Sequence, residues 1–155
     1  MNCPMDGVII RELNVRVDER GWLVELFRKD ESPSELFPKM GYVSMTRPGM
    51  SRGPHEHRRQ TDQFVFLGIV PFRLYLWDNR TSSPTYMLSY QTRVEQNHAV
   101  AVLVPPGVVH AYRNIGTADG YVFNSPDALY GGFHRAEPID EIRHELDPDT
   151  PFLLE

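Results

Sequence analysis

Short runs of β-branched and aromatic residues, separated by turn-forming residues, follow one another along most of this chain. Thirteen prolines and eleven glycines interrupt these runs, so few stretches keep the apolar period of a helix. Regularly spaced short strands with turn signals between them are typical of a β-sandwich or a barrel. We therefore expect an all-β fold with strands in the runs Val8–Val17, Trp22–Phe27, Tyr42–Thr46, Gln63–Ile69, Phe72–Trp77, Thr85–Val94, Ala99–Val104, Val108–Ile115 and Tyr121–Ser125.

Helical signals are few. One helical turn is expected within residues 32–37, and residues 138–146 are expected to form a short helix. Residues 17–22 ("VDERGW") and 77–84 ("WDNRTSSP") are expected to be turns, because Asp, Asn, Gly and Ser-Pro suit turn conformations.

The length of 155 residues fits one domain, which we expect to span residues 1–155. No apolar run approaches the roughly 20 residues that cross a bilayer, and the first residues do not resemble a secretion signal, so no membrane partner is expected. Cys3 is the only cysteine, which excludes an intrachain disulfide and favours a cytoplasmic location. The net charge of −5 argues against a nucleic-acid partner.

Two histidine motifs lie in predicted strands. Pro105, Gly107, His110 and Asn114 follow the spacing P-x-G-x-x-H-x-x-x-N, in which the prolines and the glycine shape a turn that leads into a strand. His55 and His57, in "PHEH" (54–57), share one face of a strand because strand side chains alternate. The two segments resemble the two motifs of the cupin superfamily over about residues 40–125. That resemblance implies a double-sheet jelly-roll barrel with short helical turns.

Three histidines in a barrel interior form a candidate site for one divalent transition-metal ion, with Gln63 or Asp62 as the fourth group. The cupin resemblance puts Gln63 at the place of the usual glutamate ligand, and a regular strand would then turn Asp62 to the other face. The alternative is that His55, His57 and His110 are hydrogen-bonded interior residues without a metal.

Further segments occur in the order expected for one branch of that superfamily. The chain is similar to the dTDP-4-dehydrorhamnose 3,5-epimerase family, whose members act on nucleotide-linked 4-keto sugars, over roughly residues 18–148. The resemblance rests on "DERGWLVELF" (18–27), "RGPH" (52–55), "DNRTSSPT" (78–85), "PPGVVHAY" (105–112), Tyr121, Tyr130 and Asp147-Pro148.

The resemblance implies a cofactor-independent epimerase, in which His55 is the general base, Asp147 orients it and Tyr121 is the general acid. A ketone at C4 acidifies the hydrogens on C3 and C5. Histidine suits the base because its pKa lies near neutrality, and a phenol with a pKa of about 10 keeps its proton until it is needed. The alternative is that Tyr121 is a core residue and Asp147 belongs to a turn.

The same resemblance implies the substrate-binding residues. Arg20 and Arg52 match the arginines that hold the diphosphate, where guanidinium groups form bidentate contacts. Glu25 matches a residue near the nucleoside, and His110 a supporting histidine. Tyr130 is a further candidate for a substrate contact, with packing in a loop as the alternative. Homodimers are expected, since barrels of this family commonly exchange N-terminal strands.

Two departures from the family leave three functions open. Gln63 stands where the family has a lysine that stabilises the enolate, and His57 stands where it usually has a glutamine. We therefore carry an epimerase or isomerase of a nucleotide-linked 4-keto-6-deoxy sugar as the first hypothesis. The alternatives are a metal-dependent isomerase or oxygenase that uses His55, His57, His110 and Gln63, and a non-catalytic module that binds a sugar nucleotide.

Overall fold

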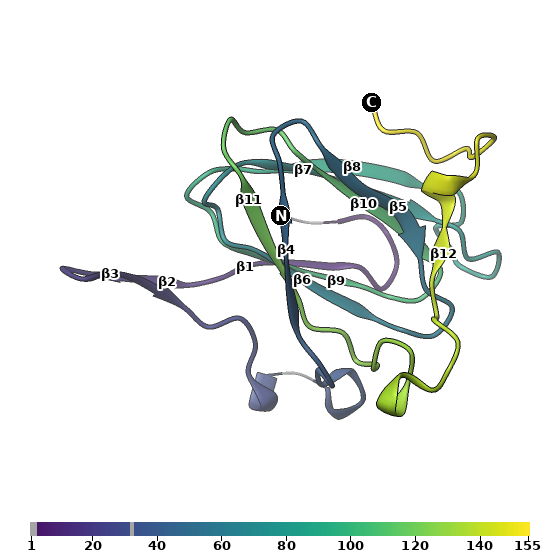
Figure 1. Cartoon of the computed structure of the whole chain (residues 1–155), viewed down its shortest axis with the longest axis horizontal. Coiled ribbons are helices and arrows are strands. Elements are labelled where there is room, and N and C mark those ends of the chain that lie inside the picture. Colours follow the sequence, from purple (N-terminus) through teal and green to yellow (C-terminus); the bar gives the residue numbers. More distant parts are fainter. Residues whose placement is uncertain (1–2, 32) are drawn as a thin grey trace.

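The computed structural model describes residues 3–31 and 33–155 and contains two five-stranded sheets and one hairpin (Figure 1). The strand pairs of the described residues are antiparallel, and apart from β7 and β8, neighbours in the two larger sheets are not consecutive in the sequence. This is the expected all-β jelly roll, which is confirmed. The first sheet has the order β1 (Ile9–Glu12), β9 (Val100–Val104), β6 (Asp62–Phe66), β11 (Gly120–Asn124), β4 (Tyr42–Thr46), and the second β12 (Ile142–Arg143), β5 (Ser51–Glu56), β10 (Val108–Asn114), β7 (Phe72–Asp78), β8 (Ser89–Val94).

The core lies between the two sheets. Phe64 and Phe66 project inward from β6 and meet rings from β7 and β10, with 5.3 Å between the ring centroids of Phe66 and Phe72 and 5.6 Å between those of Phe66 and Tyr112. Full burial of one such side chain contributes about 1.5–3 kcal/mol. This packing holds β6 and β10 at a fixed separation, and both strands carry polar residues toward one end of the barrel.

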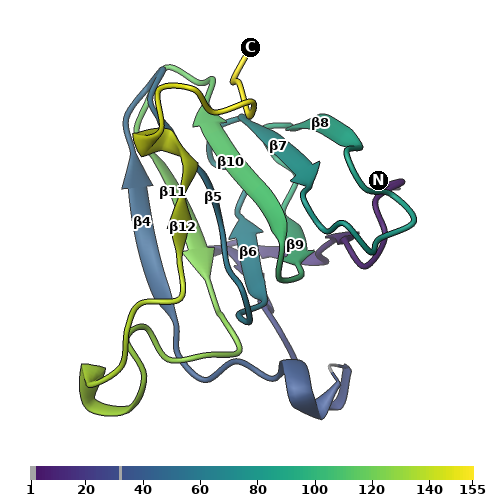
Figure 2. The same ribbon diagram turned by 90° about the vertical axis from the view of Figure 1, so that its right-hand side faces the viewer.

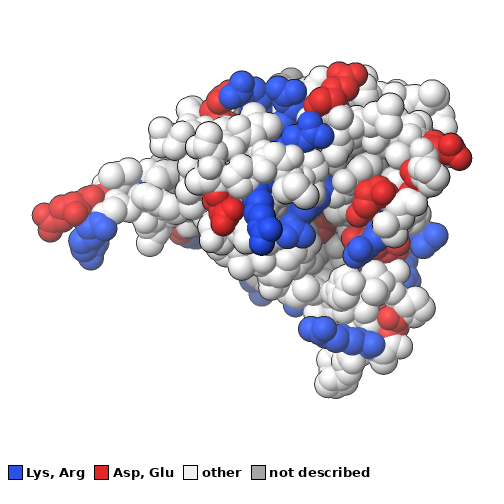
Figure 3. All heavy atoms as spheres, turned by 45° about the horizontal axis from the view of Figure 1, so that its top comes forward, with Lys and Arg blue, Asp and Glu red and all other residues white. Residues whose placement is uncertain are grey.

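The N-terminal third departs from a simple barrel. The predicted strand Val8–Val17 is divided into β1 and β2 (Val15–Asp18), and β2 pairs with β3 (Gly21–Val24) in a hairpin that projects from the body (Figure 1). Val17 is 77% exposed, and the hairpin also exposes the large side chains of Trp22 and Leu23. On the face shown in Figure 3, acidic and basic side chains are interspersed, and the projecting end carries both signs.

The helical elements of the described residues are all 3₁₀ turns. They are η1 (Lys29–Glu31), η2 (Ser34–Leu36), η3 (Phe133–Arg135) and η4 (His144–Leu146). The turn predicted within 32–37 corresponds to η2, although Ser32 lies outside the described residues.

The short helix predicted at 138–146 is wrong. Ile142 and Arg143 form β12, which pairs with Glu56 and His55 on the edge of β5, and only η4 follows it. A segment this short does not hold an isolated α-helix in water, whereas an edge strand offers unpaired backbone groups. Figure 2 shows the C-terminal segment running along this edge of the second sheet. No helix in the described part of the chain is long and apolar enough to span a membrane.

The run "DNRTSSPT" (78–85) forms a closed hydrogen-bonded loop. Asp78, whose side chain is buried, accepts hydrogen bonds from Arg80 Nε (2.8 Å) and from Ser83 Oγ and Thr85 Oγ1 (both 2.6 Å). Burial alone raises the pKa of Asp78, but these donors outweigh it and hold the pKa well below its usual range. The motif therefore shapes the loop after β7.

Candidate active site

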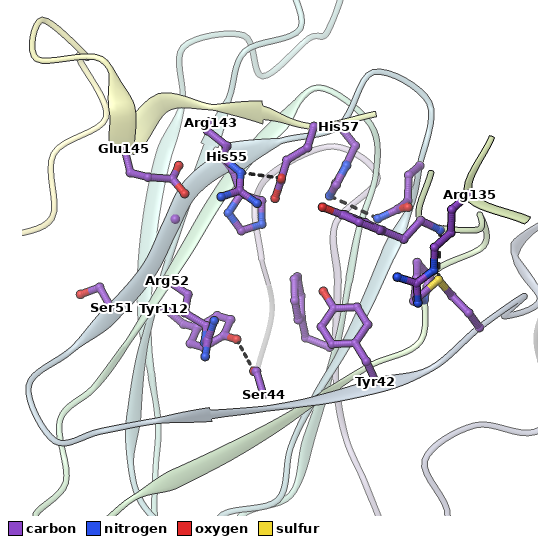
Figure 4. Close-up of a pocket in the computed structure, with 17 residues that line it drawn as sticks. Tyr42, Ser44, Ser51, Arg52, His55, His57, Tyr112, Arg135, Arg143 and Glu145 are labelled. Carbon is purple, nitrogen blue, oxygen red and sulfur yellow. Dashed lines mark hydrogen bonds and ion pairs between the residues drawn. The ribbon is translucent and has the colours of Figure 1, made fainter. Parts of the chain in front are cut away.

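A cavity of about 610 Å³ opens between the edge strands of the two sheets (Figure 4). β4 supplies one wall with Tyr42 and Ser44, and β5 supplies the opposite wall with Arg52 and His55. The C-terminal segment adds Arg143 from β12. Cavities of roughly 300–1,000 Å³ accommodate small molecules, so this one is large enough for a sugar with part of its substituent.

His55 lies in the wall formed by β5. Its Cα atom pairs with that of His110 on β10, and the two imidazole centroids are 4.4 Å apart. Burial, together with the neighbouring His110 imidazole, lowers the pKa of His55 to about 2. The ring is therefore neutral at physiological pH and has a free electron pair.

A buried carboxylate lies behind His55 and His57. Asp62 is 1% exposed, and its Oδ2 atom lies 3.1 Å from His57 Nε2 and 3.2 Å from His110 Nε2. Its Oδ1 atom accepts hydrogen bonds from Gln60 Nε2 (2.9 Å) and Asn124 Nδ2 (2.8 Å). Burial raises the pKa of Asp62, but the contacts with His110 and His57 outweigh this and hold it well below the usual range.

Asp62, not Gln63, faces the barrel interior, which corrects the orientation expected from the sequence. Gln63 pairs with Leu103 and lies with it on the outer face of the first sheet, beside Ile9 and Leu36. Asp62, Phe64 and Phe66 follow one another at two-residue intervals, so they share one face of the strand. The two large aromatic residues could have marked that face as the inner one.

Tyr121 lies on the outer face of the first sheet and does not line the cavity. It is 44% exposed, and its strand partner is Met45, which is also exposed. The described tyrosines that line the cavity are Tyr42, Tyr112 and Tyr130.

Tyr42 has the hydrogen bonding expected of a proton donor. Asn124 Nδ2 donates to its hydroxyl oxygen over 2.8 Å, while burial and the nearby Asp62 charge raise the pKa of Tyr42 to about 12. Tyr112 instead shares a hydrogen bond of 2.8 Å with Ser44 Oγ. Tyr42 was not predicted from the sequence, because only its alternation with Ser44 on β4 indicates that it faces inward.

Asp147 follows η4 and accepts a hydrogen bond from the backbone N–H of Asp149 (3.0 Å). It does not line the cavity, whereas Glu145, two residues earlier, does. Figure 4 shows the Glu145 carboxylate on the same side of the cavity as His55 and Arg143. Glu145 is therefore the acidic residue of η4 that reaches the cavity.

The predicted anion-binding residues separate into two groups. Arg52 lines the cavity and donates from Nη2 to the Met45 carbonyl (2.8 Å). Arg20 lies in the projecting hairpin, where it pairs with Asp18 over 2.5 Å and leaves 84% of its side chain exposed. Glu25 lies just after that hairpin and pairs with Arg28 over 3.3 Å.

Two cavity arginines were missed from the sequence. Arg135 lines the cavity from η3, and Arg143 lines it from β12 while donating to Glu141 over 2.7 Å. Arg143 falls in the segment expected to be a short helix, and no strand or helix was expected at Arg135, so no strand alternation was available to place them. Together with Arg52 they give the cavity three guanidinium groups.

Sequence comparisons identify related proteins. Residues 2–131 match the family described as dTDP-4-dehydrorhamnose 3,5-epimerase. The chain is 35% identical over 125 residues to "Probable low-salt glycan biosynthesis epimerase Agl13" of Haloferax volcanii, covering 79% of each chain. It is 31% identical over 112 residues to "Spore coat polysaccharide biosynthesis protein SpsL" of Bacillus subtilis, covering 72% of this chain and 73% of the other.

Solved structures share the fold. A dTDP sugar isomerase from Desulfovibrio desulfuricans superimposes with a TM-score of 0.82 at 22% identity, covering 99% of this chain and 94% of the other. Other structures with this fold were solved as complexes with dTDP-quinovose and dTDP-4-keto-L-rhamnose.

Proposed function

Because this chain belongs to the dTDP-4-dehydrorhamnose 3,5-epimerase family and is thus a sugar epimerase of the isomerase class, we propose that it acts on a nucleotide-linked 4-keto-6-deoxy sugar. The proposed reaction removes a proton from a carbon next to the ketone and returns one to the opposite face of the resulting enolate. The names of the two relatives support a place in glycan or polysaccharide synthesis. The dTDP-sugar complexes of similar folds support the substrate class.

The observation that carries this proposal is the arrangement of His55 and Tyr42 on opposite walls of one cavity (Figure 4). The neutral His55 imidazole has an electron pair with which to accept the carbon-bound proton. The Tyr42 oxygen already accepts a hydrogen bond from Asn124, so its own O–H is left to donate toward the cavity. A base and an acid that face each other across a ring are what inversion of a carbon centre requires.

The three cavity arginines support binding of a diphosphate. Arg52, Arg135 and Arg143 all line the cavity, and each presents a guanidinium group. One guanidinium group can donate two parallel hydrogen bonds to phosphate oxygens. The three arginines would therefore hold the diphosphate while the sugar lies between His55 and Tyr42. Three cations within a protein whose net charge is −5 favour a local anionic ligand over a general affinity for polyanions.

We also propose a homodimer in which the projecting hairpin completes the cavity of a second copy. Arg20 and the exposed Trp22 lie on that hairpin, outside the cavity of their own chain. An apolar hairpin that extends from its barrel gains stability when another surface covers it. This arrangement would allow Arg20 and Glu25 to contribute to substrate binding, as the family resemblance implies.

Deuterium exchange tests the epimerase proposal. The protein is incubated in D₂O with a dTDP-linked 4-keto-6-deoxyhexose, and the sugar is followed by NMR. Deuterium should enter at C3, at C5 or at both, and His55→Asn should abolish the incorporation. Saturable binding of the sugar nucleotide without any exchange would favour the non-catalytic binding module instead.

A further inference from the structure

Four side chains converge beside the cavity wall that β5 forms. One ligand atom from each of His55, His57, Asp62 and His110 lies within 4.8 Å of the corresponding atoms of the other three. They come from β5, the residue that follows it, β6 and β10. Asp62 and His110 are almost fully buried, while His55 and His57 line the cavity, so the cluster can be reached by a small solute from the cavity.

The hydrogen bonds of two imidazoles fix where their electron pairs point. His57 Nδ1 contacts the Asp140 carbonyl, and His110 Nδ1 lies 3.0 Å from the Val108 carbonyl. A carbonyl only accepts, so Nδ1 carries the proton in both rings, and in the neutral form Nε2 has the electron pair. A histidine that binds a metal commonly has this same backbone partner on its other nitrogen.

Both Nε2 atoms lie against one carboxylate oxygen, although His57 Nε2 also lies 3.2 Å from the Gln60 amide nitrogen, from which it can accept a hydrogen bond. His57 Nε2 and His110 Nε2 lie 3.1 and 3.2 Å from Asp62 Oδ2. Asp62 Oδ2 and His110 Nε2 are also buried atoms without a hydrogen-bond partner. Three electron-pair donors that face one another in a buried place repel unless a cation or added protons lie between them.

The spacing suits one metal ion. Two ligand atoms that each lie about 2.1 Å from an ion are about 3.0 Å apart at a right angle and about 3.4 Å apart at the tetrahedral angle. The separations of 3.1 and 3.2 Å fall between these values. Three imidazoles and one carboxylate form a ligand set that suits first-row divalent transition ions better than Mg²⁺ or Ca²⁺.

We propose that His55, His57, Asp62 and His110 form a binding site for one divalent transition-metal ion beside the cavity wall that β5 forms. The ion would bring positive charge next to the cavity. A coordinated nitrogen has no free electron pair, so metal binding and proton transfer by the same nitrogen of His55 exclude each other. The site itself does not depend on the proposed sugar substrate.

Cobalt titration of tag-free protein tests the site. After treatment with a chelator, the full-length protein is titrated with Co²⁺, and the visible absorption of the bound ion and the thermal midpoint are recorded. We expect saturation at one Co²⁺ per chain, absorption bands of Co²⁺ with nitrogen ligands, and a rise in the thermal midpoint. Zn²⁺ should displace the cobalt and remove the absorption.

Asp62→Asn and Gln63→Asn form the matched pair of variants. Asp62→Asn should weaken Co²⁺ binding by more than about 100-fold, while Gln63→Asn on the outer face should bind as the unaltered protein does. His55→Ala, at the cavity wall, provides a second loss of a ligand if Asp62→Asn does not fold. Absence of one-to-one binding, or binding that Asp62→Asn and His55→Ala leave unchanged, overturns the proposal. Neither measurement uses a sugar, so failure of the epimerase proposal would not change its outcome.

Discussion

Asn124 joins Asp62 to Tyr42, because its amide nitrogen lies 2.8 Å from both Asp62 Oδ1 and Tyr42 Oη. With an amide hydrogen directed to each oxygen, the Tyr42 oxygen acts as an acceptor, and its O–H is available to the cavity. The buried histidine and carboxylate cluster and the proposed proton donor are thus parts of one hydrogen-bonded network. A change at one end of this network is expected to alter the other.

Tyr42→Phe removes the proposed proton donor. We expect kcat to fall by about 10²–10⁴-fold, since a positioned acid contributes that factor, while the KM for the sugar nucleotide changes little. Steady-state kinetics with a dTDP-linked 4-keto-6-deoxyhexose measure both quantities. Tyr121→Phe is the matched control, and its exposed position on the outer face leads us to expect kcat within a few-fold of the unaltered enzyme. The reverse result would restore Tyr121 as the acid.

The pKa shifts predict an unusually flat pH profile for the metal-free enzyme. Burial lowers the pKa of His55 to about 2, so the base stays deprotonated well below its ordinary value of about 6.5. Burial and the Asp62 charge raise the pKa of Tyr42 to about 12, so the acid stays protonated well above pH 10. We expect kcat/KM to show neither an acid limb near pH 6.5 nor an alkaline limb near pH 10 wherever the protein remains folded. An acid limb centred near pH 6.5 would contradict the assignment of buried His55 as the base.

Loss of a donor to Asp78 should destabilise the fold without changing the chemistry. Thr85→Val removes a hydrogen bond of 2.6 Å to the buried carboxylate, and we expect a decrease of about 1–3 kcal/mol in the free energy of unfolding. Thr81→Val, in the same loop at an exposed position, is the matched control and should change it by less than about 0.5 kcal/mol. Urea unfolding at pH 7 measures both, and equal effects would show that the Thr85 hydroxyl does not stabilise Asp78.

The same variant has a pH signature. Because the native pKa of Asp78 lies below its unfolded value, its ionisation stabilises the protein above the unfolded pKa, and this contribution is lost as the pH falls. Thr85→Val weakens that preference for the charged form. Unfolded Asp78 titrates alike in both proteins, so the stability difference should stay constant down to about pH 4 and narrow only at lower pH, as the native carboxyl of the variant takes up its proton. A difference that widens toward acid would contradict this account.

The sequence predicts the jelly roll well because its signals are local. Short β-branched runs and the P-x-G-x-x-H-x-x-x-N motif specify strands and turns wherever the rest of the chain lies. His55 lines the cavity, and His110 lies buried beside it. The C-terminal segment was mispredicted because β12 forms by pairing with the distant strand β5. No property of residues 138–146 alone reveals that partner.

Which of two adjacent residues faces the interior was harder to predict. Every residue of β6 is buried, and Asp62 and Gln63 are both polar, so no alternation of polarity marks the inner face. A shift of one residue reverses the facing of a side chain, and a motif aligned without the structure carries that uncertainty. The facing of Tyr121 was equally hard to predict. The residue matches the family by its position in the sequence, but its side chain lies on the outer face of β11.

A mixture of two inactive variants tests whether cavities are completed by a second chain. In the proposed dimer, His55 and Arg20 of one site come from different chains, so His55→Ala and Arg20→Ala homodimers should both have strongly reduced activity. A heterodimer has one site with both changes and one with neither. Unfolding and refolding an equal mixture should restore about a quarter of the unaltered activity, because half of the dimers are mixed and each has one intact site of two. Separately refolded samples combined just before the assay are the control, and absence of recovery together with a monomeric mass in solution would exclude the shared site.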